Sequence, residues 1–193
     1  VGGVGLDRPE EAHPAALGRR RRWQPRPRCV GPSRAGTLRL GLGDELSPAL
    51  GKAQTDWVLG TADFGLPTPE VYRTLDRLRA AEEAAIEEPT AVDPMILQAL
   101  RAGDADALSR VLVNDLQRAS IELAPGLRDT LGLGESLGAI AGIVSGSGPT
   151  VALLAHSPGA AEGLANDLRH HGLDAMAVHG PVHGARIISD TLL

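Results

Sequence analysis

The sequence predicts an α+β fold, in which helices are layered on a small, largely antiparallel sheet. Two observations lead to this prediction. Along residues 36–193, short apolar runs typical of strands alternate with longer segments of helical periodicity. Two of the apolar runs, 138–144 and 150–155, are separated only by a short loop of Ser and Gly, so the two strands must be antiparallel. Helices and sheet then bury their apolar faces against each other.

Bulk composition narrows the class of protein further. A chain of 193 residues suits one domain with an extra segment, and 42% hydrophobic residues can supply its core. No apolar run approaches the roughly 18 residues of a membrane span, and no basic leader precedes an apolar stretch, so we expect a soluble cytoplasmic protein without a membrane partner. Cys29 is the single cysteine, which excludes an internal disulfide and a thiolate metal cluster.

Residues 1–35 differ in composition from the rest of the chain. Residues 1–40 hold nine Arg and three acidic residues, whereas the whole chain carries a net charge of -5. No apolar periodicity accompanies these charges, so we expect 1–35 to be an aberrant or disordered Arg/Pro-rich segment. A nucleic-acid-binding arm is the alternative, because Arg neutralises phosphates, but we expect no nucleic-acid partner. The folded domain is expected over residues 36–193.

The domain begins with a predicted strand and a predicted helix. Residues 55–63 form a short apolar run bounded by polar residues, as is typical of a strand. Residues 66–80 then have helical periodicity, with Thr68 as the expected N-cap and a proline in the first turn. An acidic linker at 82–89 follows the helix.

Residues 92–123 are expected to form two helices. Asp93 is the predicted cap of the first, and Gly103 is expected to end it. Asp104 is the predicted cap of the second, whose apolar face extends to Leu116.

A further short helix is expected to begin at Ala124. Gly132 and Gly134 are expected to stop it, because glycine is a poor helix former. The strands 138–144 and 150–155 follow.

The last predicted helix carries the fullest set of boundary signals. Ser157 is the expected cap, a proline opens the helix, and Gly172 closes it after three basic residues that the helix dipole favours. Its apolar stripe consists of Ala161, Leu164, Ala165 and Leu168. Residues 174–189 are expected to supply one or two final strands.

The loop SGSGPT is the candidate functional site. Its glycines can take positive φ and let a backbone or a phosphate approach closely, and successive N–H groups in such a turn bind anions. The sequence is no dinucleotide fingerprint, because a strand follows it, and no Walker loop, because no Lys is near. A plain glycine hairpin remains the alternative. The predicted substrate- and phosphate-binding residues are Ser145, Gly146, Ser147, Gly148 and Thr150.

Four segments resemble a known family. "AGIVSGSGPTVALLA", residues 141–155, resembles the third signature motif of the GHMP small-molecule kinases. "WVLGTADFGLPTPEVYRTLDRL", residues 57–78, resembles the family's strand and Thr-Pro helix start. Residues 113–131 resemble its Asn-Asp-Leu helix region, and residues 36–46 resemble the strand pair before them. The resemblance covers roughly residues 36–189, the C-terminal half of such a kinase.

The resemblance implies an enzyme of small-molecule metabolism. It is greatest to the branch that phosphorylates 4-diphosphocytidyl-2-C-methyl-D-erythritol in non-mevalonate isoprenoid biosynthesis. Such a kinase transfers the γ-phosphoryl group of ATP, with Mg²⁺ as cofactor, to a small-molecule substrate. By this resemblance Gly146, Ser147 and Gly148 would offer backbone N–H groups, and Thr150 would fix the loop or donate its hydroxyl.

The family's N-terminal half is not matched in this chain. That half brings a glycine-rich ATP loop and a catalytic Asp and Lys, whereas no acidic residue occurs from Ala12 to Gly43. We therefore assign no catalytic residue and expect a fragment that is inactive alone and self-associates through uncovered apolar surface. A frameshifted or misplaced start would explain residues 1–35. The alternatives are a homoserine- or mevalonate-type GHMP kinase, or a non-catalytic α+β module that binds a small ligand.

Other chemistry-bearing residues are expected to have no special role. Asp63 and Asp115 are candidate carboxylates, but a strand end and a helix surface usually leave such groups solvated. His179 and His183 are separated by Gly-Pro, which breaks a helix, so no metal site is expected.

Overall fold

The described part of the chain consists of short apolar strands and of helices, several of them capped by side chains. The computed structural model describes residues 36–40, 45–49, 53–82 and 93–182, all within the unit Gly31–Leu193. The Arg/Pro-rich segment, Cys29, His183 and the end of the predicted final strands therefore lie outside the described residues. Strand β1 (Gly36–Leu40) pairs antiparallel with β2 (Glu45–Ala49), which confirms the strand pair expected there.

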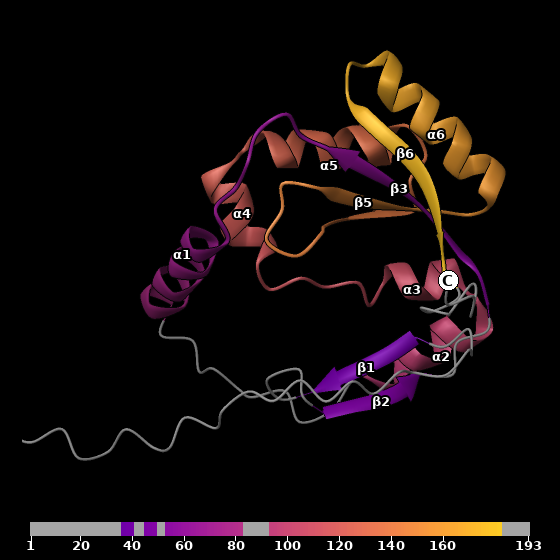
Figure 1. Ribbon diagram of the computed structural model, residues 1–193, viewed down its shortest axis with the longest axis horizontal. Coiled ribbons are helices and arrows are strands. Elements are labelled where there is room, and N and C mark those ends of the chain that lie inside the picture. Colours follow the sequence, from indigo (N-terminus) through magenta and orange to yellow (C-terminus); the bar gives the residue numbers. More distant parts are fainter. Residues whose placement is uncertain (1–35, 41–44, 50–52, 83–92, 183–193) are drawn as a thin grey trace, which may run out of the picture. The chain divides into compact units, whose positions relative to one another are not determined.

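The four remaining strands form one antiparallel sheet. They are β3 (Thr55–Thr61), β4 (Ala141–Val144), β5 (Val151–Ala155) and β6 (Asp174–Gly180). Their order is β4-β5-β3-β6, and every pair of neighbours is antiparallel. The small antiparallel sheet predicted from the sequence is confirmed (Figure 1).

Six helices accompany this sheet in the described part of the chain. They are α1 (Thr68–Ala81), α2 (Pro94–Ala102), α3 (Ala105–Ser109), α4 (Gln117–Leu123), α5 (Gly126–Ser136) and α6 (Pro158–His170). None of these helices is long and apolar enough to cross a membrane.

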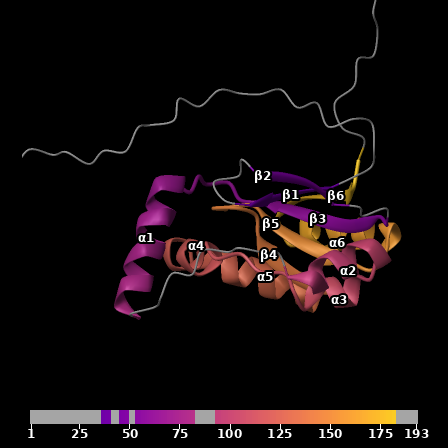
Figure 2. The same ribbon diagram turned by 90° about the horizontal axis from the view of Figure 1, so that it is seen from below.

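The main core lies between one face of the sheet and helices α5 and α6 (Figure 2). Strand alternation places Val58 and Leu153 on this face, and both are fully buried. The α6 stripe predicted from the sequence, Ala161, Leu164, Ala165 and Leu168, is buried against them. The expected layering of helices on the sheet is thus confirmed.

The second face of the sheet is covered only in part by the described residues. Leu154 is fully buried there, in a small cluster with Ala99 of α2 and Leu108 of α3. Trp57, which pairs with Leu154 across the strands, packs against the same cluster and is half-buried.

Helix caps agree with the sequence at three sites and differ at one. The side chains of Asp93, Asp104 and Ser157 each accept a hydrogen bond from a backbone N–H in the first turn of α2, α3 and α6. The expectation for α1 is wrong, because Pro67 is the N-cap residue and no side chain caps the helix. The hydroxyl of Thr68 contacts Ser147 instead.

The long helix predicted after Asp104 is interrupted. Helix α3 ends at Ser109, and α4 begins only at Gln117. Between them the side chain of Asn114 accepts a hydrogen bond from Leu116 N–H at 3.0 Å, a local turn that competes with a continuous helix.

The prediction that glycines stop the helix after Ala124 is also wrong. Helix α5 continues through Gly132 and Gly134 to Ser136. A Cβ atom at Gly134 would lie 2.5 Å from Cδ1 of Leu153, so glycine here permits close contact between α5 and β5.

Candidate phosphate-binding loop

The loop between β4 and β5 closes by its own backbone hydrogen bonds. Ser145 N–H donates to the carbonyl of Thr150 at 2.8 Å, and Gly148 N–H donates to the carbonyl of Ser145 at 3.0 Å. Gly146 has φ 59° and Gly148 has φ 79°, a left-handed conformation that glycine adopts without strain. The expectation that these two glycines take positive φ is confirmed.

The two glycines differ in the space around them. A Cβ atom at Gly148 would lie 3.1 Å from Cγ1 of Val144 and 3.6 Å from Cδ2 of Leu66, so this position is packed. A Cβ atom at Gly146 would meet nothing within 4 Å. Gly146 is therefore the open side of the loop, where a ligand has room.

Side chains from the segment before and within α4 hold the carbonyl groups of the loop. Nδ2 of Asn114 donates to the carbonyls of Val144 at 2.7 Å and Gly146 at 2.8 Å. Oγ of Ser120 donates to the carbonyl of Ser147 at 3.0 Å. Within the described part of the chain, the N–H groups of Gly146 and Ser147 have no hydrogen-bond partner. The loop thus offers two adjacent backbone donors.

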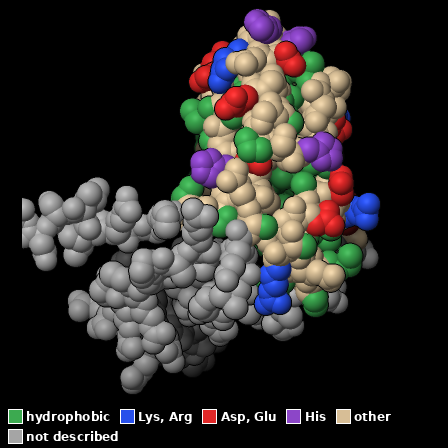
Figure 3. Space-filling view, turned by 90° about the vertical axis from the view of Figure 1, so that its right-hand side faces the viewer, with side chains coloured by type: hydrophobic (Ala, Val, Ile, Leu, Met, Phe, Trp, Pro, Cys, Tyr) green, Lys and Arg blue, Asp and Glu red, His purple; other side chains and the backbone are tan. Residues whose placement is uncertain are grey.

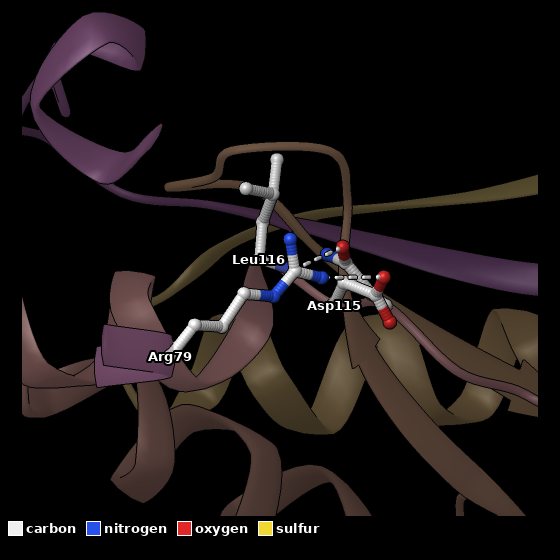
Figure 4. A network of polar contacts seen from close by, with 4 residues as sticks. Arg79, Asp115 and Leu116 are labelled. Carbon is white, nitrogen blue, oxygen red and sulfur yellow. Dashed lines mark hydrogen bonds and ion pairs between the residues drawn. The ribbon is translucent and has the colours of Figure 1, made fainter. Parts of the chain in front are cut away.

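Helix α1 contacts the loop from another side. Oγ1 of Thr68 and Oγ of Ser147 lie 2.8 Å apart. Helix α1 is in turn joined to α4 and the residues before it by three ion pairs: Arg77–Glu122, Arg118–Glu82 and Arg79–Asp115. Figure 4 shows Arg79 directed at Asp115, next to Leu116, with 3.1 Å between the charged atoms. These solvated pairs orient α1 and add little stability.

A groove of about 520 Å³ lies beside the loop. The loop contributes Ser145 and Gly146 to its wall. Its floor is the second face of the sheet, made of Trp57, Leu59, Ile143, Ala152 and Val178. The groove combines an apolar floor with polar backbone groups at its edge, which is typical of small-molecule sites.

The predicted site residues are placed together but are not equivalent. Ser145 and Gly146 are exposed, whereas Ser147, Gly148 and Thr150 are half-buried. The N–H of Gly148 is used inside the turn, so it is not available to a ligand.

Sequence reasoning missed the roles of Asn114 and Ser120. Both lie in the Asn-Asp-Leu segment that carried part of the family resemblance, which was the available signal. Each lies about thirty residues from the loop in the sequence, so local sequence patterns could not predict the contact.

The carboxylates and histidines named in the sequence do not gather into a site. Asp63 is exposed, and the side chain of Asp115 is 76% exposed and paired with Arg79. Figure 3 shows histidine side chains spread over one face rather than gathered around one point. In the described ranges, no group of three or more His, Cys, Asp or Glu side chains could hold a metal ion.

The fold and loop agree with what comparison with known proteins finds. Residues 96–174 match the family model described as GHMP kinases C terminal. The chain therefore contains the C-terminal domain of the GHMP kinase family.

The most informative relatives within this family share one name. The 4-diphosphocytidyl-2-C-methyl-D-erythritol kinase of Arthrobacter sp. (strain FB24) is 83% identical over 154 residues, which are 80% of this chain and 48% of the relative. The kinase of the same name from Pseudarthrobacter chlorophenolicus is 79% identical over 154 residues, with the same coverage. The chain thus spans about half the length of these curated relatives.

Solved structures agree with this assignment. A crystal structure of 4-(cytidine 5'-diphospho)-2C-methyl-D-erythritol kinase matches with a TM-score of 0.55 and 28% identity, covering 75% of this chain and 48% of that chain. L. major mevalonate kinase in complex with R-mevalonate matches with a TM-score of 0.56 and 15% identity, covering 70% and 44%. The second likeness concerns the fold alone.

Proposed function

We propose that this chain supplies the C-terminal half of a cytoplasmic kinase that phosphorylates 4-diphosphocytidyl-2-C-methyl-D-erythritol with ATP, in isoprenoid biosynthesis. The observation that carries the proposal is the loop 145–150, which has two unpaired N–H groups and borders a groove at Ser145 and Gly146, in a chain 83% identical to a kinase of that name. Residues 36–193 form the functional domain, and residues 1–35 lie outside it.

The role of the loop follows from the charge of phosphate. Phosphoryl transfer depends on positioning and on neutralising developing negative charge. The N–H groups of Gly146 and Ser147 can donate to phosphate oxygens, and the hydroxyl groups of Ser145, Ser147 and Thr150 are further donors. Backbone donors fixed in advance suit this task, because they need no reorganisation when charge develops.

No catalytic residue and no Mg²⁺ ligand is assigned to this chain. The described residues hold no cluster of carboxylates or histidines that fits a metal ion. Mg²⁺ would neutralise phosphate charge when bound, and its ligands would come from the nucleotide and from the half of the kinase that this chain does not match.

The second face of the sheet is where we expect that other half to pack. Its residues Trp57, Leu59 and Val178 are only half-buried, and Met176 beside them is 51% exposed. Since the chain spans about half of its relatives, the missing half is the natural cover for this apolar surface. Without it, we expect the chain to self-associate, which light scattering can measure. A monodisperse monomer at high concentration would contradict this expectation.

The decisive experiment combines this chain with the N-terminal half of the Arthrobacter relative. ADP formation is measured with ATP and the diphosphocytidyl substrate, and with homoserine or mevalonate as control substrates. We expect turnover only with both halves and only with the diphosphocytidyl substrate. Turnover with homoserine or mevalonate would assign a different kinase, and substrate binding without turnover would favour a non-catalytic module.

A further inference from the structure

We infer that Asn114 is a positioning residue of the loop, because it sets the direction of the Ser147 N–H, one of the two N–H groups that remain unpaired. The use of those groups for phosphate rests on the function proposed above. The hydrogen bonds of Asn114 to the loop do not depend on that function.

The trans peptide unit is planar. In each peptide plane, the C=O of one residue and the N–H of the next point in opposite directions. A side chain that holds a carbonyl therefore also fixes where the following N–H points. Asn114 holds the carbonyl of Gly146 at 2.8 Å, so it fixes the N–H of Ser147 on the opposite side of that plane.

The neighbouring planes are fixed in the same way. The carbonyl of Ser145 accepts from Gly148 N–H at 3.0 Å, which fixes the N–H of Gly146. The carbonyl of Val144 is held by Asn114, and the N–H of Ser145 in the same plane donates to Thr150. Both unpaired N–H groups thus belong to planes whose carbonyl is tied on the other side. Gly146, with φ 59°, lies between them, and adjacent donors around a left-handed residue form an anion-binding concavity.

Asn114 itself has one possible orientation. Both hydrogens of Nδ2 are used, on Val144 and Gly146, and Oδ1 accepts from Leu116 N–H at 3.0 Å. The reversed amide would place an oxygen against two carbonyl oxygens and an NH₂ group against an N–H. Every polar atom of the side chain therefore has a suitable partner in this orientation. The two carbonyl oxygens that Nδ2 holds also point towards Asn114, and not towards an anion bound at the unpaired N–H groups.

Ser120 completes the arrangement at the next plane. It is fully buried, and its single hydroxyl hydrogen is shared between the carbonyls of Ser147 and Leu116, each 3.0 Å from Oγ. Because the N–H of that plane belongs to Gly148 and is used in the turn, Ser120 supports the shape of the loop without setting a free donor.

The test replaces one atom group and uses a matched control. Asn114→Asp keeps the acceptor for Leu116 but replaces the NH₂ group by a carboxylate oxygen that faces two carbonyls. Asn166→Asp makes the same change on the exposed surface of α6, where Oδ1 of Asn166 accepts from Arg169. Amide resonances of Gly146 and Ser147 are followed by ¹H–¹⁵N NMR in the full 193-residue chain.

We expect the Ser147 amide resonance to shift in Asn114→Asp at pH 7, while the same resonance in Asn166→Asp matches that of the unsubstituted protein. Lowering the pH from about 7 to about 4 should partly reverse the change, because the introduced carboxyl group becomes a donor once it is protonated. The two carbonyl oxygens that face this carboxyl group disfavour its charged form, so its pKa lies above the ordinary value of Asp. The Ser147 amide of Asn166→Asp should show no such reversal.

Titration with inorganic triphosphate separates this inference from the proposed function. We expect triphosphate to shift both loop amides in the unsubstituted protein, and Asn114→Asp to bind it at least about tenfold more weakly at pH 7. Equal binding by a folded Asn114→Asp, or unchanged loop amides, would overturn the inference and leave the proposed function standing. Failure of the unsubstituted protein to bind would instead count against the proposed function, and the ligand-free resonances would still decide the role of Asn114.

Discussion

Alanine at Gly134 and alanine at Gly132 are expected to change the stability of this domain in opposite directions. Both glycines lie in the interior of α5, so each replacement gains the same helix propensity. They differ in surroundings, because Gly134 is buried against Leu153 and Gly132 is exposed, with nothing within 4 Å of a Cβ atom. Comparing the two variants therefore isolates the packing of α5 on the sheet.

The magnitudes follow from these surroundings. Replacing a glycine by alanine inside a helix contributes roughly 0.5–1 kcal/mol of stability. At Gly134 the added Cβ would lie 2.5 and 2.6 Å from the two Cδ atoms of Leu153, which is itself fully buried. Overpacking of this kind costs about 1–3 kcal/mol. We thus expect Gly132→Ala to stabilise, Gly134→Ala to destabilise, and the two variants to differ by about 1–3 kcal/mol.

Urea denaturation measures this difference directly. The free energy of unfolding is obtained from the midpoint and slope for each variant, with thermal melting as a second measurement. For a domain of this size, 1 kcal/mol corresponds to about 2–4 °C in Tm. The reasoning is refuted if Gly134→Ala is as stable as Gly132→Ala or more so.

Three further replacements test other parts of the fold. Ser157→Ala removes the hydroxyl that accepts from Ala160 N–H, and should lower stability by about 1 kcal/mol in urea denaturation; no change would show that this cap contributes nothing. Leu168→Ala empties a site that is 1% exposed, and should cost about 2–5 kcal/mol in thermal melting, whereas a cost below that range would contradict its place in the core. Arg79→Ala breaks the solvated pair with Asp115, so it should cost less than about 1 kcal/mol, and a large loss that persists in high salt would refute the surface role of this pair.

The sequence was most informative where a local rule decides the structure. Ser157 and the apolar stripe of α6 are signals within one helix, and the structure confirms them. The antiparallel pairing of β4 and β5 was predictable for the same reason, because a short loop leaves no other arrangement.

Two of the errors arise from contacts distant in the sequence, and the third from a local turn combined with such a contact. Gly134 does not stop α5, because Leu153 of the sheet occupies the space that a side chain at Gly134 would take. Thr68 does not cap α1, because its hydroxyl reaches Ser147. The helix predicted through Leu116 is interrupted where Asn114 turns towards the loop. In each case tertiary contact overrides a local preference, which no single-segment pattern can reveal.

Likewise, the glycines and serines of the loop 145–150 made it a candidate phosphate site, but they could not say which of its amides are unpaired. That depends on the backbone bonds inside the turn and on Asn114, whose side chain holds the carbonyl of Gly146.

The strand order β4-β5-β3-β6 has a consequence for the folding of this domain during its synthesis on the ribosome. Strand β3 ends at Thr61, yet its two neighbours are Val151–Ala155 and Asp174–Gly180, the latter near the end of the described chain. At about 5–20 residues per second, the nascent chain spends on the order of ten seconds with this central strand unaccompanied. Its apolar residues are then available to other molecules, so a polypeptide cut short before Asp174 should be a client of chaperones rather than a smaller folded protein.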